Sequence, residues 1–476
     1  MHDYCALGAR HEQMKRTFIL ILIVVAALVG MYFLPQISLC GIDLRPVDLL
    51  SDIRATDSDS TDTVTDTIPM PEPAVPGDSI PEGMTAIEDF RDSLNREREM
   101  DHFYEALDDV RKRVIRIAYF GDSFIEGDIF TANLRELLQE QYGGRGVGFV
   151  DIHSQIAGFR TTVLEHSSGW QDYSANEHGK GFNPRQQGIN SRYFIPNGSA
   201  AINIQGQHTV FPQHLDTVDC AIVYYTPADG MTMTAKVNGK EAMMSCSPMS
   251  EQTADTLCDS TETASPETTD IRKAVITGKI GKLRVEIGGG GRFYGVAMEG
   301  RNGIVVDNFS MRGSSGWHLS TIPAETLKAF ARLRHYDLIV MHYGLNVATT
   351  TKGYEAYCNK FKESIHNFRE AFPETSILIT SVSNRDHRNA KGEFETMKGI
   401  AELVSAQRQM AKDERIAFWN LQQAMGGSGS TYRMQQAGQA NRDYTHINFK
   451  GGSVIGQLLF DVLQNGKMNY DRRKKK

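Results

Sequence analysis

The residues best placed for chemistry in this sequence surround Ser123, in the stretch YFGDSFIEGD at residues 119–128. Ser123 comes soon after the apolar run VIRIAYF, which is typical of a buried strand. If a helix begins after this point, its free backbone N–H groups favour an anion beside the Ser123 hydroxyl, which suits a nucleophile. The alternative is a serine that only caps the helix. The position of Ser123 alone leaves both interpretations open.

A serine nucleophile needs a base, and His446 is the most suitable of the 14 histidines. It stands three residues after Asp443 in the sequence DYTH. On a tight turn, a carboxylate at this spacing reaches the Nδ1–H of the histidine and leaves Nε2 to accept the serine proton. One alternative is a surface aspartate and histidine with no shared task. Another is His342 as the base, although it lacks a nearby acidic companion and also suits a place in the core.

Acyl transfer also needs N–H donors for the oxyanion, each worth on the order of 3 kcal/mol. Two more polar segments follow apolar runs and can supply them. Gly313 follows GIVVDNFS in the sequence MRG, where a glycine lets a backbone N–H approach closely. Asn346 follows YDLIVMHY in the sequence GLN, where its amide can donate. We therefore predict an oxyanion hole made by the Ser123 N–H, the Gly313 N–H and the Asn346 amide.

The elements that must position these residues alternate between apolar runs and helical segments. Strands are predicted at residues 114–120, 303–310, 336–343, 375–382 and 415–421. Helices are predicted at residues 128–141, 323–334, 353–372, 394–412 and 449–464, and amphipathic helices within residues 86–113. This alternation is typical of a three-layer α/β/α sandwich with a parallel five-stranded sheet. In such a sheet, functional residues gather at the carboxyl ends of the strands.

Residues 151–302 interrupt this alternation. They lack helical periodicity and contain alternating runs such as AAINIQG, DCAIVYYT and KLRVEIGG, separated by Gly, Pro and Asn-Gly. A structureless loop of this length is rare inside a compact domain. The pattern therefore predicts an inserted antiparallel β-sandwich.

The first 85 residues predict a tethered protein. Residues 18–34, FILILIVVAALVGMYFL, form an unbroken apolar run at the short end of what spans a bilayer as a helix. Because basic residues precede the run, residues 1–17 are expected in the cytoplasm and the later chain outside it. A cleaved signal peptide and a lipoprotein modified at Cys40 are the alternatives. Residues 35–85, rich in Asp, Ser, Thr and Pro, are predicted to be a disordered linker.

Charge and cysteine content narrow the choice of partners and of crosslinks. The 476 residues carry a net charge of -7, and basic side chains are scattered except in the terminal DRRKKK. Nucleic acid is therefore not expected as a partner, because its binding needs a clustered cationic face. Six cysteines are too few for a disulfide framework in a chain of this length. In an oxidising compartment Cys246 and Cys258 are expected either to form a disulfide or to stay as free thiols.

The order of the polar segments resembles the four blocks of the SGNH hydrolases, also called the GDSL family. The resemblance extends over residues 114–150 and 303–465, with the insert between them. Phe124 stands where the family name has Leu, and Val347 follows the block-three Asn where many members have Asp. The residues of the four blocks are Ser123 in GDS, Gly313 in MRGSS, Asn346 in GLN, and Asp443 with His446 in DYTH.

This resemblance implies a carboxylic ester hydrolase formed by residues 86–150 and 303–476. Ser123 would be the nucleophile, His446 the base and Asp443 the residue that orients the imidazole, with no metal or organic cofactor. Exported members with such an insert act on O-acetyl groups of cell-wall or extracellular polysaccharide, and the insert resembles a carbohydrate-binding module. The resemblance therefore implies an O-acetylesterase whose partner is acetylated polysaccharide or peptidoglycan.

Two other functions fit the same residues. An O-acetyltransferase would use the same triad, with a sugar hydroxyl in place of water and a membrane partner that hands over acetyl groups. A non-catalytic glycan-binding protein would keep the fold without the chemistry. In each case we expect the folded part to be held at the membrane by the N-terminal helix and to lie outside the cytoplasm, in the periplasm or at the cell surface.

Overall fold

The computed structural model describes residues 37–39, 42–44, 78–90, 98–177, 181–247, 270–348 and 353–475. The chain divides into two compact units, Met1–Glu72 and Pro73–Lys476. In the first unit, β1 (Ile37–Leu39) pairs antiparallel with β2 (Ile42–Leu44). The predicted cytoplasmic tail and membrane anchor lie outside the described residues, as does Cys258. None of the helices in the described part of the chain is long and apolar enough to cross a membrane.

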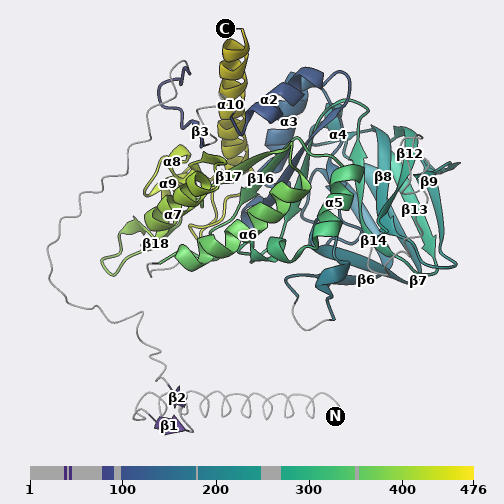
Figure 1. The fold of residues 1–476 in the computed structure, drawn as a ribbon, viewed down its shortest axis with the longest axis horizontal. Coiled ribbons are helices and arrows are strands. Elements are labelled where there is room, and N and C mark those ends of the chain that lie inside the picture. Colours follow the sequence, from purple (N-terminus) through teal and green to yellow (C-terminus); the bar gives the residue numbers. More distant parts are fainter. Residues whose placement is uncertain are drawn as a thin grey trace, which may run out of the picture. The chain divides into compact units, whose positions relative to one another are not determined.

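A six-stranded sheet forms the centre of the second unit (Figure 1). The first five strands in spatial order are mutually parallel, as the sequence predicts. Their side chains are mostly buried, because helices cover both faces of a parallel sheet. The strands, in this order, are β15 (Gly303–Ser310), β4 (Val114–Gly121), β16 (Leu338–His342), β17 (Ser376–Thr380), β20 (Ala417–Trp419) and β3 (Ile87–Asp89).

The prediction of a five-stranded sheet was wrong at one edge, where β3 adds a sixth strand. β3 pairs antiparallel with β20, with Ile87 opposite Trp419. The sequence analysis assigned this segment to amphipathic helices, since a three-residue strand is too short to show alternation. The Trp419 indole also donates to the Thr85 carbonyl at 3.1 Å, and the Asn465 amide donates to the Ser79 carbonyl at 2.9 Å. The packed chain therefore begins before the predicted end of the linker.

Helices cover both faces of this sheet (Figure 1). α3 (Thr131–Tyr142) packs against α10 (Phe449–Lys474), which also contacts α2 (Asp101–Ala106). α5 (Ala324–Leu333), α6 (Glu355–Ala371) and α7 (Ile400–Asp413) contact one another in succession in front of the sheet in this view. Each buries one apolar face. The remaining short elements are α4 (Pro212–Leu215), β18 (Asp386–Arg388), β19 (Phe394–Thr396), α8 (Leu421–Ala424) and α9 (Ser430–Gln436).

The inserted segment, together with β5 just before its predicted start at residue 151, forms a second sheet with a hydrophobic core of its own. Its ten described strands are all antiparallel, as predicted, and hydrogen bonds join them into one sheet. Its division into the two layers of a sandwich stays a prediction. The strands are β5 (Gly148–Val150), β6 (Val163–Ser174), β7 (Arg192–Gly206), β8 (Val218–Thr226), β9 (Thr232–Val237), β10 (Lys240–Ala242), β11 (Ser245–Ser247), β12 (Arg272–Ile280), β13 (Lys282–Gly288) and β14 (Arg292–Glu299).

A buried cluster of charges joins the two sheets. The guanidinium of Arg334 is fully buried and donates to Asp307 at 2.6 Å and to Glu299 at 2.8 Å. Glu299 ends β14 of the insert, whereas Asp307 lies in β15 of the parallel sheet. Arg116 of β4 donates to the other oxygen of Glu299 at 2.5 Å. These hydrogen-bonded pairs offset the cost of burying charge, and they fix the insert against the strands that carry the candidate site.

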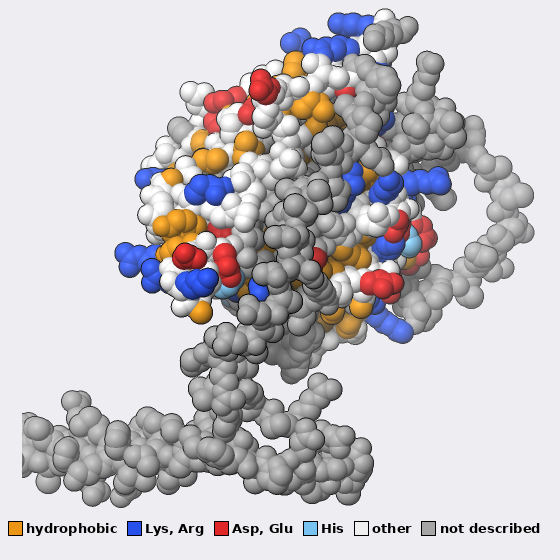
Figure 2. Space-filling view, turned by 90° about the vertical axis from the view of Figure 1, so that its left-hand side faces the viewer, with side chains coloured by type: hydrophobic (Ala, Val, Ile, Leu, Met, Phe, Trp, Pro, Cys, Tyr) orange, Lys and Arg blue, Asp and Glu red, His pale blue; other side chains and the backbone are white. Residues whose placement is uncertain are grey.

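Acidic and basic side chains are intermingled on the face drawn in Figure 2. Lys and Arg gather at the top of the view, where α10 ends. Two of these basic residues pair with acidic neighbours, Arg473 with Asp101 at 2.5 Å and Lys474 with Asp108 at 3.5 Å. Local ion pairs therefore neutralise part of the basic end of α10.

Candidate active site

The turn after β4 carries Ser123. β4 ends at Gly121, and Ser123 opens a short 3₁₀ segment, η2 (Ser123–Asp128). Asp122 caps this segment, because its Oδ1 accepts the Phe124 N–H at 2.9 Å. Gly121 has no room for a side chain, since a Cβ there would lie 2.9 Å from a neighbouring isoleucine side chain. The packing of the turn therefore needs the glycine, and its cap needs the aspartate.

A chain of hydrogen bonds connects Ser123 with His446 and Asp443. The Ser123 hydroxyl lies 3.0 Å from His446 Nε2, and His446 Nδ1 lies 2.7 Å from Asp443 Oδ2. Asp443 Oδ1 accepts the backbone N–H groups of Thr445 and His446, each at 3.0 Å. The structure therefore brings together the three residues that the sequence analysis predicted for nucleophile, base and orienting acid.

The loop with Asp443 and His446 lies between α9 and α10 and is closed at its base. Ala440 and Ile447 form an antiparallel bridge, and the Asn441 N–H donates to the His446 carbonyl at 2.8 Å. Burial raises the pKa of Asp443, but hydrogen bonds from the side chain and backbone of His446 outweigh burial and hold that pKa below its ordinary value. Asp443 therefore stays ionised at neutral pH and can stabilise an imidazolium.

Gly313 lies in the loop after β15. Its φ is +74°, in the left-handed region that glycine adopts without strain. The turn is closed by the Ser314 N–H, which donates to the Met311 carbonyl at 3.1 Å. Among the described residues, the Gly313 N–H has no acceptor. This exposed N–H is thus available to a ligand oxygen, as the predicted oxyanion hole requires.

Asn346 lies in the loop after β16 and holds the other two loops together. Its Nδ2 donates to Asp122 Oδ2 at 3.1 Å and to the Ser314 carbonyl at 2.9 Å. An amide has two N–H groups, and both are directed at these acceptors. To bind an oxyanion, Asn346 must share or release one of these bonds. The sequence analysis missed this role of Asp122, although the residue stands beside the serine in the same motif.

Asp122 is a buried carboxyl with an unusual proton affinity. Its side chain is 1% exposed. Burial raises its pKa to about 6, against the opposing effects of the Phe124 N–H, the charge of His446 and the Asn346 amide. Asp122 therefore changes its charge near neutral pH, beside the residue predicted to donate to the oxyanion.

His342, the alternative base, is a core residue. It is 3% exposed and lies between aromatic rings, with its centroid 5.1 Å from that of Phe124. Its Nδ1 lies 3.3 Å from the Tyr119 hydroxyl. Burial lowers its pKa to about 3, so it is neutral at physiological pH. These contacts fit the interpretation of His342 as a packed core side chain.

Two residues of the insert hold the loop that carries Gly313. Arg192 of β7 donates to the Ser310 carbonyl at 3.1 Å. Asn176, just after β6, donates from its Nδ2 to the Arg312 carbonyl. The Arg312 carbonyl and the Gly313 N–H belong to one planar peptide group, so a bond to one fixes the direction of the other. The sequence analysis missed both insert residues, since no local motif marks them.

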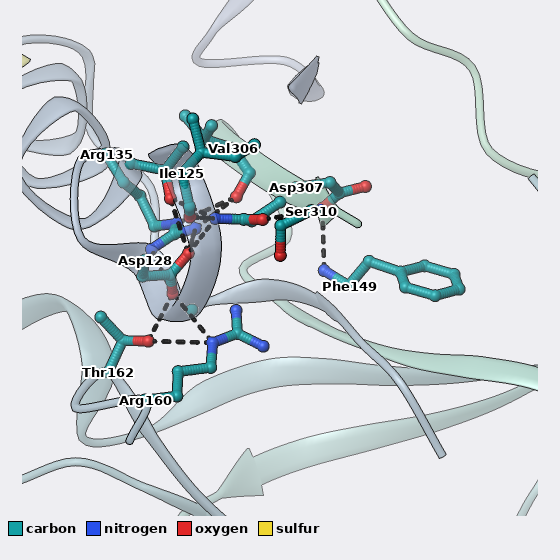
Figure 3. A network of polar contacts seen from close by, with 12 residues as sticks. Ile125, Asp128, Arg135, Phe149, Arg160, Thr162, Val306, Asp307 and Ser310 are labelled. Atoms are coloured by element: carbon teal, nitrogen blue, oxygen red, sulfur yellow. Dashed lines mark hydrogen bonds and ion pairs between the residues drawn. The ribbon is translucent and has the colours of Figure 1, made fainter. Parts of the chain in front are cut away.

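A buried network surrounds Asp128, the last residue of the 3₁₀ segment that Ser123 opens (Figure 3). Asp128, at the end of η2, accepts hydrogen bonds from Thr131 at 2.6 Å and from Arg160 at 2.9 Å, and it also binds Thr162 and Arg135. Burial raises the pKa of Asp128, but the charges of Arg135 and Arg160 outweigh it and hold that pKa far below its ordinary value. Because Arg160 and Thr162 belong to the insert, this carboxylate joins the insert to the turn with Ser123.

The side chains of Ser123, His446 and Asp443 are arranged for nucleophilic catalysis. They supply a hydroxyl, an imidazole in contact with it, and an ionised carboxylate that orients the imidazole. The Gly313 N–H and the Asn346 amide lie on loops at the same edge of the parallel sheet. In the described parts of the chain, no group of three or more His, Cys, Asp or Glu side chains is arranged to hold a metal ion.

The chain shares its fold with a solved structure, although its sequence matches no known family. No protein-family model and no curated protein sequence matches the chain. A solved structure described as "Peptidoglycan O-acetylesterase in action" has a similar fold, with a TM-score of 0.62 and 20% identity over 80% of this chain and 99% of that one. A putative GDSL-like lipase from Parabacteroides merdae matches 34% of this chain and 74% of that one, with 14% identity and a TM-score of 0.25. The likeness to the peptidoglycan O-acetylesterase structure shows that the two chains share a fold.

Proposed function

We propose that this protein is a serine esterase that removes O-acetyl groups from cell-wall or extracellular polysaccharide. The observation that carries the proposal is the hydrogen-bonded chain from Ser123 through His446 to Asp443. A hydroxyl 3.0 Å from an imidazole nitrogen, whose other nitrogen binds a carboxylate, has the geometry of an activated nucleophile.

The reaction proceeds through an acetyl-enzyme. Ser123 Oγ attacks the ester carbonyl while His446 Nε2 takes its proton. The Ser123 and Gly313 N–H groups and the Asn346 amide bind the oxyanion. His446 then gives the proton to the oxygen of the leaving sugar, which departs as a hydroxyl group. Water, deprotonated by the same imidazole, attacks the acetyl-enzyme, releases acetate and restores the serine.

The fold and the sequence support a glycan substrate and an exported enzyme. The likeness to the peptidoglycan O-acetylesterase covers 80% of the chain, whereas the segments assigned to the α/β part make up about half, so the likeness extends beyond the α/β part. The apolar run at residues 18–34 supports anchorage in a membrane with the enzyme outside the cytoplasm. The substrate is therefore proposed to be acetylated peptidoglycan or another acetylated polysaccharide.

Acetate release tests this proposal. The full chain and its Ser123→Ala variant are incubated with acetylated peptidoglycan and with a panel of acetylated polysaccharides, and free acetate is measured. We expect release by the wild type and none above background by the variant, with equal thermal melting temperatures. Equal release by both proteins would refute the assignment. If a glycan acceptor becomes acetylated in place of acetate release, the protein is an O-acetyltransferase, and binding without either reaction indicates a non-catalytic glycan-binding protein.

A further inference from the structure

A cavity of about 520 Å³ lies between the insert and the loops of the candidate active site. Glu126 in its wall is three residues from Ser123, and Arg312 directly precedes Gly313. The cavity therefore shares a wall with the nucleophile turn and with the oxyanion loop. Its other side is formed by insert residues, among them His153, Asp172 and Arg192.

The charged side chains of this cavity are largely paired with one another. Asp151 lies 3.1 Å from Arg192 and Asp128 lies 2.9 Å from Arg160, while Glu126 binds Arg312 and Asp172 binds His153. A polyanionic ligand would be repelled, because carboxylates outnumber guanidinium groups in this wall. A polycationic ligand would have to compete with the basic side chains that already pair with four of the carboxylates. The five carboxylates are Glu126, Asp128, Asp151, Asp172 and Glu177, and the three guanidinium groups are Arg160, Arg192 and Arg312.

Two buried polar atoms on residues of the cavity wall have no hydrogen-bond partner among the described residues. They are Nη2 of Arg160, whose side chain is 8% exposed, and Oδ1 of Asp172. One is a donor and the other an acceptor. A buried polar atom without a partner is costly to the fold, so the two atoms mark polar groups of this wall that the chain itself does not satisfy. A sugar hydroxyl both donates and accepts, so it can pair with either kind of polar group in this wall.

An exposed aromatic ring lies beside the cavity. Phe159, in the insert loop between β5 and β6, is 45% exposed. Its ring packs against Phe449, three residues after His446, with the centroids 5.5 Å apart. It also covers Gly127 of the cavity wall, where a Cβ would lie 2.5 Å from the ring. An aromatic face next to paired polar groups is the combination that binds the apolar and hydroxylated sides of a sugar ring.

We propose that this cavity, with Phe159 at its side, is a subsite for an uncharged stretch of glycan chain. It holds the polymer while an acetyl group on a neighbouring sugar reaches Ser123. The subsite presupposes the esterase function proposed above and adds a place and a substrate class to it. The preferred substrates are acetylated glycans with a neutral backbone, ahead of polyuronates and of cationic amino-sugar polymers.

Paired kinetic measurements on the full chain test the subsite. The variants are Phe159→Ala, Asp172→Asn and their combination, and the substrates are acetylated glucomannan and 4-nitrophenyl acetate. We expect the ratio of the two kcat/KM values, polymer over small ester, to fall at least tenfold in the double variant. The control is Met243→Ala, at a position that is 94% exposed on the insert, where both values should stay within twofold. The wild type should also prefer acetylated glucomannan to acetylated polygalacturonate by at least tenfold.

Binding measurements separate this subsite from the esterase function. Calorimetric titration of Ser123→Ala with deacetylated glucomannan oligosaccharides should give saturable binding, at least tenfold weaker when Phe159→Ala and Asp172→Asn are added. If the ratio of the two kcat/KM values or the binding is unchanged in the folded double variant, the subsite proposal is wrong. The esterase proposal is not affected by that result. A preference for polygalacturonate would overturn the neutral substrate class. Absence of acetate release from every substrate would instead count against the esterase, while the binding result still decides the subsite.

Discussion

The acid–base pair and the oxyanion donors of the candidate site are built in different ways. Asp443 and His446 lie on one turn, and the aspartate binds both the side chain and the backbone of the histidine. The donors come from three loops after three strands, and the Gly313 loop is held by residues of the insert. The proton relay is thus a local structure, whereas the oxyanion site depends on packing between distant segments.

The largest effect is expected at the local turn. His446→Ala should lower kcat for 4-nitrophenyl acetate by about 10³-fold or more, because Ser123 loses its proton acceptor. The control is His208→Ala, an exposed histidine of the insert, which should keep activity within twofold. Initial rates with purified, folded variants check this. Activity of His446→Ala near the wild-type level would show that another group is the base.

The second-largest effect is expected at Asn346, which connects the loops after β4 and β15. Asn346→Ala should lower kcat about 10²-fold, since it removes an oxyanion donor and frees Asp122 and the Ser314 carbonyl. Asn346→Asp should lose at least as much, because a carboxylate cannot donate and would lie beside Asp122. Steady-state kinetics at pH 7.5 measure both. Retention of a third of the activity by either variant would remove Asn346 from the oxyanion site.

The buried carboxyl of Asp122 predicts a pH dependence of stability. Its pKa is raised from 3.8 to about 6 in the folded chain, so the folded state binds more protons than the unfolded state between about pH 4 and 6. The free energy of unfolding therefore falls as pH rises through this window, by roughly 3 kcal/mol from this group. Asp122→Asn should lack this loss. Urea unfolding from pH 4 to pH 8 measures the free energy of unfolding of both proteins. The difference between wild type and variant should grow up to about pH 6 and then stay constant. A difference that is the same at every pH would contradict this prediction.

The smallest effect is expected at Asn176, which acts on the oxyanion site from the insert. Asn176→Ala should lower kcat for 4-nitrophenyl acetate about two- to tenfold with little change in KM, because one exposed hydrogen bond is worth about 0.5–1.5 kcal/mol. Asn176→Gln should restore part of it. The matched control is Asn203→Ala, whose amide binds the His166 carbonyl within the insert. A change in KM without a change in kcat, or an equal loss of kcat in the control, would contradict the proposed effect of the insert on the Gly313 N–H.

The parts that sequence predicted are those that local pattern determines. Strand and helix periodicity placed the five parallel strands, and each predicted site residue follows a strand or stands on a tight turn. The spacing of Asp443 and His446 predicted that the carboxylate can reach the imidazole on a tight turn, and the structure has this hydrogen bond. Local sequence also marked the glycine and serine of the β4 turn.

The parts that sequence missed arise from contacts between distant segments. β3 is too short for its pattern to be read, and only its pairing with β20 makes it a strand. The bond of Asn176 to the Arg312 carbonyl spans 136 positions of the chain, and that of Asp122 to Asn346 spans 224. No local motif encodes such pairs, because the first follows from how the insert packs on the parallel sheet and the second from the pairing of β4 with β16.

Covalent labelling tests the central claim, that Ser123 is a nucleophile activated by His446, most directly. The full chain is treated with a fluorophosphonate probe, and the adduct is located by peptide mass spectrometry. We predict one adduct, on Ser123, with labelling absent in Ser123→Ala and slowed at least 10²-fold in His446→Ala. Esterase activity that persists without labelling of Ser123, or with the adduct on another residue, would contradict the account.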